Sequence, residues 1–265
     1  MEQIRVFVSG ATGKMGREVV RAVIADKELL LVGAADTHFQ GSDAGQLAGT
    51  DPVGIKITAL SAESLKTSGA QVMVDFTTPK SVLANGKLAL ENGVRPVIGT
   101  TGLTDNEMAE IRALAEKLQT GAFIAPNFSI GAILMMNFAR EAARYFPHVE
   151  IIELHHDQKL DAPSGTGLKT AEMIASVRPE MSQGHADEYE KLPGVRGGEF
   201  KGLRIHSVRL PGLVAHQEVI FGGLGQTLSI RHDAFNRETY MTGVIHAVKK
   251  VLEIQGLIVG LENIM

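Results

Sequence analysis

Residues 4–35 read IRVFVSGATGKMGREVVRAVIADKELLLVGAA, and this stretch decides the fold. An apolar run at residues 4–9 leads into a glycine-rich turn, after which residues 14–25 carry apolar side chains at helical spacing. Residues 29–35 form a nearly continuous apolar run, which is typical of a strand buried on both faces. The stretch therefore predicts a strand, a helix and a second, parallel strand.

The same alternation continues through the first half of the chain. Apolar runs predict further strands at residues 72–76, 95–99 and 122–125. Thr78 with Pro79 predicts a helix start, and Thr104 with Glu107 forms a capping box before a helix that runs to about residue 119. We expect an α/β fold with a Rossmann-like, doubly wound parallel sheet.

The pattern changes after residue 128, where a second domain is expected to begin. A helix is predicted over residues 129–146, and strands over residues 149–154, 203–210, 214–221 and 227–232. Residues 178–202 are rich in Gly, Pro and charge and indicate a long surface excursion. These features predict an α+β domain with a mixed or antiparallel sheet over residues 129–235.

The final predicted helix, residues 236–254, has an amphipathic pattern that suits packing back onto the first domain. The first domain is therefore expected to comprise residues 1–128 and 236–265, so that the chain crosses between domains twice.

Composition narrows the function. Of the 265 residues, 44% are hydrophobic and 21% are charged, the net charge is −4, and basic residues form no stripe, so nucleic acid is an unsuitable partner. There are no cysteines, which excludes thiolate metal sites and cysteine nucleophiles. The N-terminus lacks a signal-peptide pattern and no apolar stretch approaches the roughly 18 residues of a membrane span, so we expect a soluble, cytoplasmic protein.

The glycine-rich turn predicts a dinucleotide site. Gly10, Gly13 and Gly16 stand between the first strand and the first helix, where glycine lets backbone amides approach a pyrophosphate at the helix N-terminus. A purely structural turn is the alternative, because the spacing is GxxGxxG rather than GxGxxG. Asp36, at the end of the second strand, has the offset expected of a ribose-binding carboxylate and favours the dinucleotide interpretation.

Cofactor choice depends on the same carboxylate. Asp36 favours NAD and would repel the extra phosphate of NADP, and its neighbour is Thr37 rather than an arginine. Lys14 or His38 could offset a phosphate charge, so use of both cofactors stays open.

Two further clusters follow predicted strands at the carboxyl edge of the sheet, where ligands bind in such folds. The first comprises Gly99, Thr100, Thr101 and Gly102, and the second runs from Ala125 to Phe128. A helix-entry loop in front of Thr104 is the alternative for the first cluster.

The chemistry is expected in residues 153–166, which read ELHHDQKLDAPSGT. Such a density of polar side chains just beyond a strand is costly inside a core and indicates an active site. His155 and His156 should point to opposite faces, so one can donate a proton while the other binds substrate. Lys159 offers a positive charge for a carboxylate, or a second proton.

The end of this stretch predicts an anion cradle. Ser164, Gly165 and Thr166 precede a helix that runs to about residue 177, and their amides and hydroxyls suit a carboxylate. Asp161 and Pro163 indicate a turn and no chemistry. A metal site is the competing interpretation of the whole stretch, but Lys159 would oppose a cation and no recognisable motif places a third ligand.

The sequence resembles the 4-hydroxy-tetrahydrodipicolinate reductase (dihydrodipicolinate reductase) family of the diaminopimelate route to lysine. The resemblance runs almost end to end and is carried by ELHHDQKLDAPSGTG at 153–167, VSGATGKMG at 8–16, VDFTTP at 74–79, GTTG at 99–102 and APNFSIG at 125–131. It implies hydride transfer from NADH or NADPH to the ring of a small cyclic dicarboxylic acid, with water lost from the hydroxylated form, in a homotetramer assembled through the second domain's sheet.

The resemblance also implies roles for residues. His155 would donate the proton, Lys159 would assist, His156 would bind substrate, and Gly165 with Thr166 would hold a carboxylate. The implied cofactor residues are Gly10, Ala11, Thr12, Gly13, Lys14, Met15, Asp36, Gly99, Thr100, Thr101, Ala125, Pro126, Asn127 and Phe128. Thr37 departs from members that favour NADPH, which often carry an arginine there.

Two other functions compete. A semialdehyde dehydrogenase of an amino-acid pathway could share the two-domain plan, but such enzymes use a thiol nucleophile that this chain lacks. A dinucleotide sensor without turnover would not need the HHxxK group.

Overall fold

A computed structural model describes residues 2–179 and 181–265. The chain forms two units: the first contains the chain up to Ser129 together with Tyr240–Met265, and the second contains Ile130–Thr239. The expected domain boundaries, at residues 128 and 235, lie one and four residues before these divisions.

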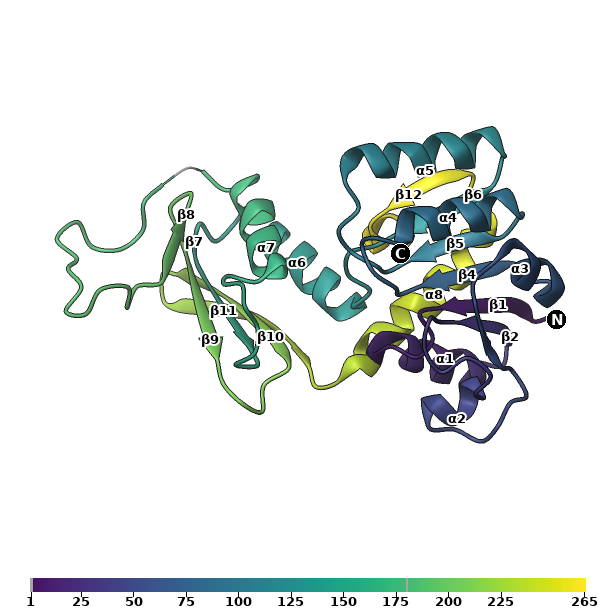
Figure 1. The fold of residues 1–265 in the computed structure, drawn as a ribbon. Helices are drawn as coiled ribbons and strands as arrows, with labels where there is room; N and C mark the ends of the chain where they lie inside the picture. The colour runs from purple at the N-terminus through teal and green to yellow at the C-terminus, as the bar shows by residue number, and fades with distance from the viewer. Residues whose placement is uncertain (1, 180) are drawn as a thin grey trace. The chain divides into compact units, whose positions relative to one another are not determined.

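The first unit is built on a parallel sheet with the strand order β12-β6-β5-β4-β1-β2-β3 (Figure 1). Its strands are β1 (Ile4–Ser9), β2 (Leu29–Ala35), β3 (Ile57–Thr58), β4 (Val72–Asp75), β5 (Arg95–Ile98), β6 (Gly121–Ile124) and β12 (Gly256–Val259). β1 and β4 are parallel neighbours, and the strand order reverses between them: β2 and β3 lie on one side, and β5 and β6 lie on the other. Ligands bind at the carboxyl ends of the strands beside such a reversal. The predicted doubly wound fold is confirmed.

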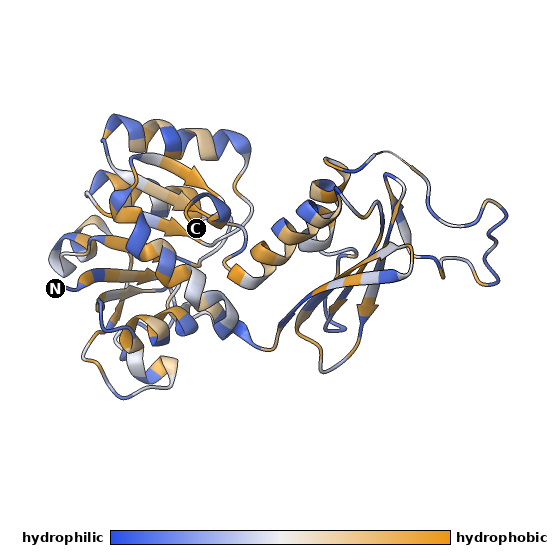
Figure 2. Ribbon diagram, turned by 180° about the vertical axis from the view of Figure 1, so that it is seen from behind, coloured by the Kyte–Doolittle hydropathy of each residue, from blue (hydrophilic) through white to orange (hydrophobic). Residues whose placement is uncertain are grey.

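Helices cover this sheet in two groups. The helices of the first unit are α1 (Lys14–Ala25), α2 (Ala44–Ala48), α3 (Ala62–Ser68), α4 (Val82–Glu91), α5 (Asp105–Lys117) and α8 (Met241–Lys250). In one group α4 contacts both α3 and α5, and in the other α1 contacts α2 and α8. In Figure 2 the strands between them are largely orange, because a sheet covered by helices on both faces needs apolar side chains on both.

The capping box predicted at Thr104 and Glu107 is present, but α4 begins later than expected. Thr104 and Glu107 exchange hydrogen bonds at the start of α5. After Pro79, a hydrogen-bonded turn closed by Ser81 precedes the first helical residue, Val82. Thr78 and Pro79 therefore belong to the loop at the carboxyl end of β4.

The predicted helix over residues 236–254 is shorter in the structure. A 3-10 turn (Arg237–Tyr240) precedes α8, a second (Val251–Glu253) follows it, and α8 packs against α1 and β5 within the first unit. The strand β12 comes next and pairs in parallel with β6. β12 was not predicted, because an apolar run of four residues carries no periodicity of its own.

The second unit contains a mixed sheet with the strand order β11-β10-β7-β9-β8. Its strands are β7 (His148–His155), β8 (Gly198–Phe200), β9 (Leu203–Arg209), β10 (Ala215–Gly223) and β11 (Gln226–Ala234), and its helices are α6 (Ile130–Ala142) and α7 (Gly165–Ala175). β7 and β9 are parallel, and the other neighbours are antiparallel. The predicted mixed sheet is confirmed, while the region expected to be an excursion, residues 178–202, also contributes β8.

α6 and α7 cover one face of this sheet. Ala139 of α6 and Ile174 of α7 share a buried core with Ile151 and Val219 of the sheet. Because side chains alternate along a strand, Ile152, on the opposite face of β7, lies away from these helices. None of the helices within residues 2–179 and 181–265 has the length and apolar character that crossing a membrane requires.

Candidate active site

Packing explains two of the three glycines in the turn after β1. Gly10 has a φ of +78°, and a Cβ there would lie 2.3 Å from the carbonyl oxygen of Phe76. A Cβ on Gly16 would lie 1.9 Å from the carbonyl oxygen of Gly10. At Gly13, by contrast, the nearest atom to a Cβ is 3.4 Å away, and this residue caps α1 without a side chain. The helix N-terminus is thus left accessible to an anionic group, as a pyrophosphate requires.

A cavity of about 640 Å³ lies within the first unit at the carboxyl ends of β1, β2 and β4. Gly10, Gly13 and Asp36 are among its lining residues, so the structure brings these predicted cofactor residues together. Thr37 and His38 also line it, beside the carboxylate. The glycine turn, the open helix end and the carboxylate fit a dinucleotide.

The carboxylate of Asp36 is held in place by backbone donors. The N–H of Thr12 donates to Oδ2 at 3.0 Å, and the N–H of His38 donates to Oδ1 at 3.2 Å. Burial raises the pKa of Asp36, but the hydrogen bonds from Thr12 and from the backbone after β2 outweigh it and hold the pKa below its ordinary value. Asp36 therefore remains an acceptor that can bind ribose hydroxyls at neutral pH.

The remaining residues of the turn play different parts. Ala11 is buried and donates its N–H to the carbonyl oxygen of Ala35, which ties the turn to β2. Lys14 and Met15 begin α1, and Lys14 is exposed.

Asp75, at the end of β4, is a residue that the sequence analysis missed. Its carboxylate is fully buried and accepts hydrogen bonds from the hydroxyls of Thr77 and Thr100, each at 2.7 Å, and from the amide of Asn85 at 2.8 Å. The side chain of Thr100, predicted to bind cofactor, is therefore engaged inside the protein. A charged residue ending a buried strand was the available signal, since a buried charge needs partners.

Aromatic packing fixes the residues that follow β5 and β6. Phe128 is buried, and its ring centroid lies 5.8 Å from that of Phe76 and 6.0 Å from that of Phe123. A Cβ on Gly99 would lie 2.2 Å from the ring of Phe76. Packing of Phe76 thus explains the glycine at 99, and Ala125 to Phe128 follows β6 at the same edge of the sheet.

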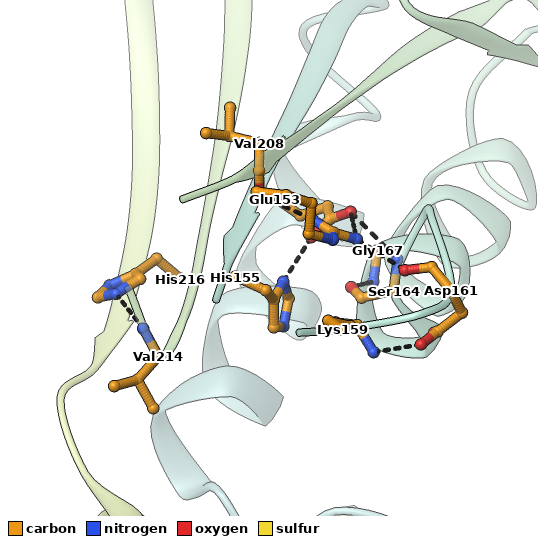
Figure 3. A network of polar contacts seen from close by, with 10 residues as sticks. Glu153, His155, Lys159, Asp161, Ser164, Gly167, Val208, Val214 and His216 are labelled. Atoms are coloured by element: carbon orange, nitrogen blue, oxygen red, sulfur yellow. Dashed lines mark hydrogen bonds and ion pairs between the residues drawn. The ribbon is translucent and has the colours of Figure 1, made fainter. Parts of the chain in front are cut away.

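The second group of predicted residues gathers at the end of β7 (Figure 3). His155 is the last residue of β7, its side chain is 15% exposed, and its Nδ1 lies 2.5 Å from Oε2 of Glu153. His156 follows the strand and is exposed. Because β7 ends at His155, the strand alternation expected for the pair does not apply to His156. One histidine is held by a carboxylate, and the other is open to solvent.

Glu153 is the centre of this group. Its side chain is fully buried, and Arg209 of β9 donates to both carboxylate oxygens, at 2.7 and 2.9 Å. Burial raises the pKa of Glu153, but hydrogen bonds from His155 and Arg209 outweigh it and lower the pKa to about 2. The residue is a carboxylate at any pH at which the protein works.

Lys159 lies in the loop after β7, and its Nζ is 2.7 Å from Oδ1 of Asp161. The backbone carbonyl of Asp161 accepts a hydrogen bond from Arg209 at 2.8 Å. Asp161, predicted to be a turn residue, therefore also holds the lysine and links its loop to β9. Figure 3 shows the side chains of Lys159 and Asp161 pointing toward each other.

The predicted anion cradle forms the start of α7. Ser164 caps the helix: its hydroxyl accepts the N–H of Gly167 at 3.0 Å, and its own N–H donates to Glu153 at 3.3 Å. Gly165 and Thr166 are the first two helical residues, whose N–H groups have no intrahelical acceptor. No atom lies within 4 Å of a Cβ built on Gly165. The backbone there is open to a carboxylate, whereas Ser164 is occupied with capping.

Glu153 and Arg209 are functional candidates to which the sequence analysis gave no role. Glu153 points to the same face of β7 as the core residues Val149 and Ile151. A carboxylate on that buried face requires a buried cation. The alternation of side chains along the predicted strand could therefore have identified Glu153. Arg209 stands 56 residues away, and no local pattern identifies it.

No group of three or more His, Cys, Asp or Glu side chains that could hold a metal ion occurs in the part of the chain that the structure describes.

Two family models match the chain, and they meet at the first division between the two units. The family model described as dihydrodipicolinate reductase, N-terminus, matches residues 4–128, and the one described as dihydrodipicolinate reductase, C-terminus, matches residues 131–265. The chain belongs to the dihydrodipicolinate reductase family. It is an NAD(P)H-dependent oxidoreductase, and the predicted family resemblance is confirmed.

Individual relatives agree with this assignment. The 4-hydroxy-tetrahydrodipicolinate reductase of Desulfitobacterium hafniense is 62% identical over the whole of both chains. A dipicolinate-bound dihydrodipicolinate reductase from Paenisporosarcina sp. TG-14 superposes with a TM-score of 0.88 at 50% identity, covering 99% of this chain and 100% of that one. An amine dehydrogenase from Mycobacterium smegmatis, 17% identical with a TM-score of 0.65 over 96% of this chain and 94% of that one, shares the fold alone.

Proposed function

We propose that this reductase converts 4-hydroxy-tetrahydrodipicolinate to tetrahydrodipicolinate, with water lost and the ring reduced by one hydride and one proton. The observation that carries the proposal is the group of His155, Lys159 and the open N-terminus of α7 at one end of the second unit's sheet. A cyclic dicarboxylate needs cationic and N–H donors for its carboxylates and a proton donor near its ring, and this group supplies all of them.

The residues of the second unit divide the work. His155 donates the proton, because its Nδ1 contacts Glu153 and its other ring nitrogen remains for substrate. Lys159 places its charge beside the reacting ring and supports the proton transfer. The N–H groups of Gly165 and Thr166 bind one carboxylate, and the exposed His156 contacts the substrate from the solvent side.

The first unit binds the cofactor, which supplies a hydride when bound. The N–H groups of Lys14 and Met15, in the first turn of α1, would hold the pyrophosphate, and Asp36 would bind the ribose hydroxyls of the adenosine half. The loops Gly99 to Thr101 and Ala125 to Phe128, at the carboxyl ends of β5 and β6, hold the nicotinamide half.

The environment of Asp36 favours NADH. A 2′-phosphate would meet this carboxylate, and the side chain that follows it is Thr37. Lys14 and, when it is protonated, His38, whose side chain is 77% exposed, could partly offset the phosphate charge. We therefore expect NADH to be preferred and NADPH to be used more weakly. Reduced nicotinamide pools lie inside the cell, so the proposed location is the cytoplasm.

We further propose that the enzyme assembles as a homotetramer through the second unit's sheet. Ile152, Leu154 and Ile220 lie on the face of this sheet opposite α6 and α7, and each is only partly buried. Apolar side chains on an uncovered sheet face favour association. Light scattering tests this: a mass of four chains is expected, and Ile152→Glu should lower it, whereas a monomeric wild-type protein would contradict the proposal.

The reaction is tested by mixing the purified protein with freshly generated 4-hydroxy-tetrahydrodipicolinate and following the absorbance of NADH. We expect NADH oxidation to depend on both the substrate and the protein. Absence of turnover with either cofactor would leave the dinucleotide sensor as the better explanation. Turnover only with a different carbonyl or imine substrate would favour another dehydrogenase of the same fold.

A further inference from the structure

The contacts of Glu153 determine which ring nitrogen of His155 carries the hydrogen. Both oxygens of Glu153 are occupied: Oε1 by Arg209 and the N–H of Ser164, and Oε2 by Arg209 and Nδ1 of His155. An ionised carboxylate only accepts hydrogen bonds, so Nδ1 of His155 must carry the hydrogen in this contact. Nε2 is then the nitrogen left for chemistry.

The same pair also connects the rest of the site. Arg209 donates to the carbonyl of Asp161, whose carboxylate holds Lys159, and Glu153 accepts from Ser164, which caps the cradle helix. Three separate segments therefore meet at one buried ion pair: the end of β7, the lysine loop and the start of α7.

We propose that Glu153 and Arg209 are positioning residues, which together fix His155 with hydrogen on Nδ1 and hold the lysine loop and the start of α7 in place around it. The proposal rests on the assignment of His155 as proton donor. A carboxylate that sets the tautomer of a catalytic imidazole without contacting substrate can account for a large part of turnover.

The Glu153→Gln variant gives a specific spectroscopic expectation. Arg209 and the N–H of Ser164 are donors that cannot become acceptors. The glutamine amide can place its oxygen in the position of Oε1, where two such donors converge, and its NH₂ in the position of Oε2. The hydroxyl of Ser207, which also hydrogen-bonds this carboxylate, and the imidazole are the partners that can change roles. Because the NH₂ group would face Nδ1 of His155, we expect Nδ1 to accept and the hydrogen to move to Nε2.

The first measurement is the ¹⁵N NMR spectrum of neutral His155 in the ligand-free protein, assigned by comparison with His155→Gln. We expect the Nδ1–H tautomer in wild type and the Nε2–H tautomer in Glu153→Gln. A wild-type protein with hydrogen on Nε2 would overturn the proposal. This readout requires no turnover, so it is independent of whether the proposed reaction is correct.

The second measurement is steady-state kinetics. Glu153→Gln should lower kcat by about 100-fold or more while leaving the KM for NADH within about threefold. In the His155→Gln background the same change should have little further effect, because residues that act through one another are not additive. An equal loss in both backgrounds would show that Glu153 does not act through His155.

Glu150→Gln is the matched control. Glu150 lies on the same strand, pairs with Arg196 at 2.6 Å and with His206 at 2.7 Å, and points to the opposite face of the sheet. Glutamine keeps the size of this side chain, which lies on the face proposed for subunit association, so we expect a mass of four chains and a kcat within about threefold of wild type. An equal fall in kcat for both variants would mean that removal of any paired carboxylate from β7 disturbs the unit, and would contradict the proposal.

Arg209→Lys separates the two halves of the pair and remains informative if Glu153→Gln does not fold. Lysine keeps the charge but cannot reach both oxygens of Glu153 and the carbonyl of Asp161 together. We expect an unchanged tautomer of His155, a lower kcat and a higher KM for the dicarboxylate. Wild-type kinetics in this variant would remove Arg209 from the proposal.

Discussion

Replacing Asp36 with asparagine should change which cofactor the enzyme prefers. The carboxylate accepts Thr12 N–H through Oδ2 and His38 N–H through Oδ1, and its side chain is 13% exposed. The lone pairs not used by these amides are available to ribose hydroxyls at the edge of the cavity. Asparagine keeps the size of the side chain but replaces one acceptor oxygen with a donor.

The magnitude follows from the contacts. A hydrogen bond to a charged group contributes about 1.5–3 kcal/mol, and 1.4 kcal/mol corresponds to a tenfold change, so the Kd for NADH should rise by about 10- to 100-fold. Loss of the negative charge removes its repulsion of a 2′-phosphate, which is about 1 kcal/mol at 5 Å in a well-solvated site. The ratio of kcat/KM for NADH over NADPH should therefore fall by about 100-fold in Asp36→Asn.

The assay is steady-state kinetics with NADH and NADPH side by side, together with fluorescence titration of each cofactor. Asp51→Asn is the control, because Asp51 is an exposed aspartate of the first unit that is not among the residues lining the cavity. A wild-type enzyme that prefers NADPH tenfold, or an Asp36→Asn ratio within threefold of wild type, would refute the role given to this carboxylate.

Other variants test the chemistry and the packing. His155→Gln should mainly lower kcat, and Lys159→Ala should lower kcat and raise the KM for the dicarboxylate; wild-type kinetics in either would withdraw its role. Between pH 5 and 2 the unfolded chain binds more protons at Glu153 than the folded chain, since its pKa falls from 4.5 to about 2 on folding. Acid titration of the unfolding free energy should therefore lose about 3 kcal/mol over that range through this residue, and a flat profile would contradict it. Gly10→Ala should destabilise by several kcal/mol in thermal unfolding, whereas Gly41→Ala, with a φ of +84° and no atom within 4 Å of a Cβ, should cost only about 1 kcal/mol. Equal losses would show that the approach to Phe76 does not matter.

The sequence predicts those parts of the fold and site that depend on neighbours along the chain. β1, the glycine turn, α1 and β2 form one local unit, and Asp36 is found by its offset from the turn. The polar stretch after β7 is also local, so His155 and Lys159 could be singled out by composition alone.

Features that depend on distant pairing were not predictable in this way. β12 is four residues long and exists as a strand because β6 offers it an edge. The partners of Asp75 include Thr100, 25 residues on, and the partner of Glu153 is Arg209, 56 residues on. A lone sequence shows that a buried carboxylate needs a cation or several donors, but it does not show which ones.

The position of β12 also has a consequence for the folding of the chain during its synthesis on the ribosome. Because the outermost strand of the first sheet is made from residues 256–259, the ribosome must finish the intervening unit before the nucleotide-binding half can close its edge. Until then β6 presents unpaired backbone groups, which can recruit a strand from another nascent chain. Deleting residues 256–265 would leave that vulnerable state permanent, and insoluble protein is the expected product.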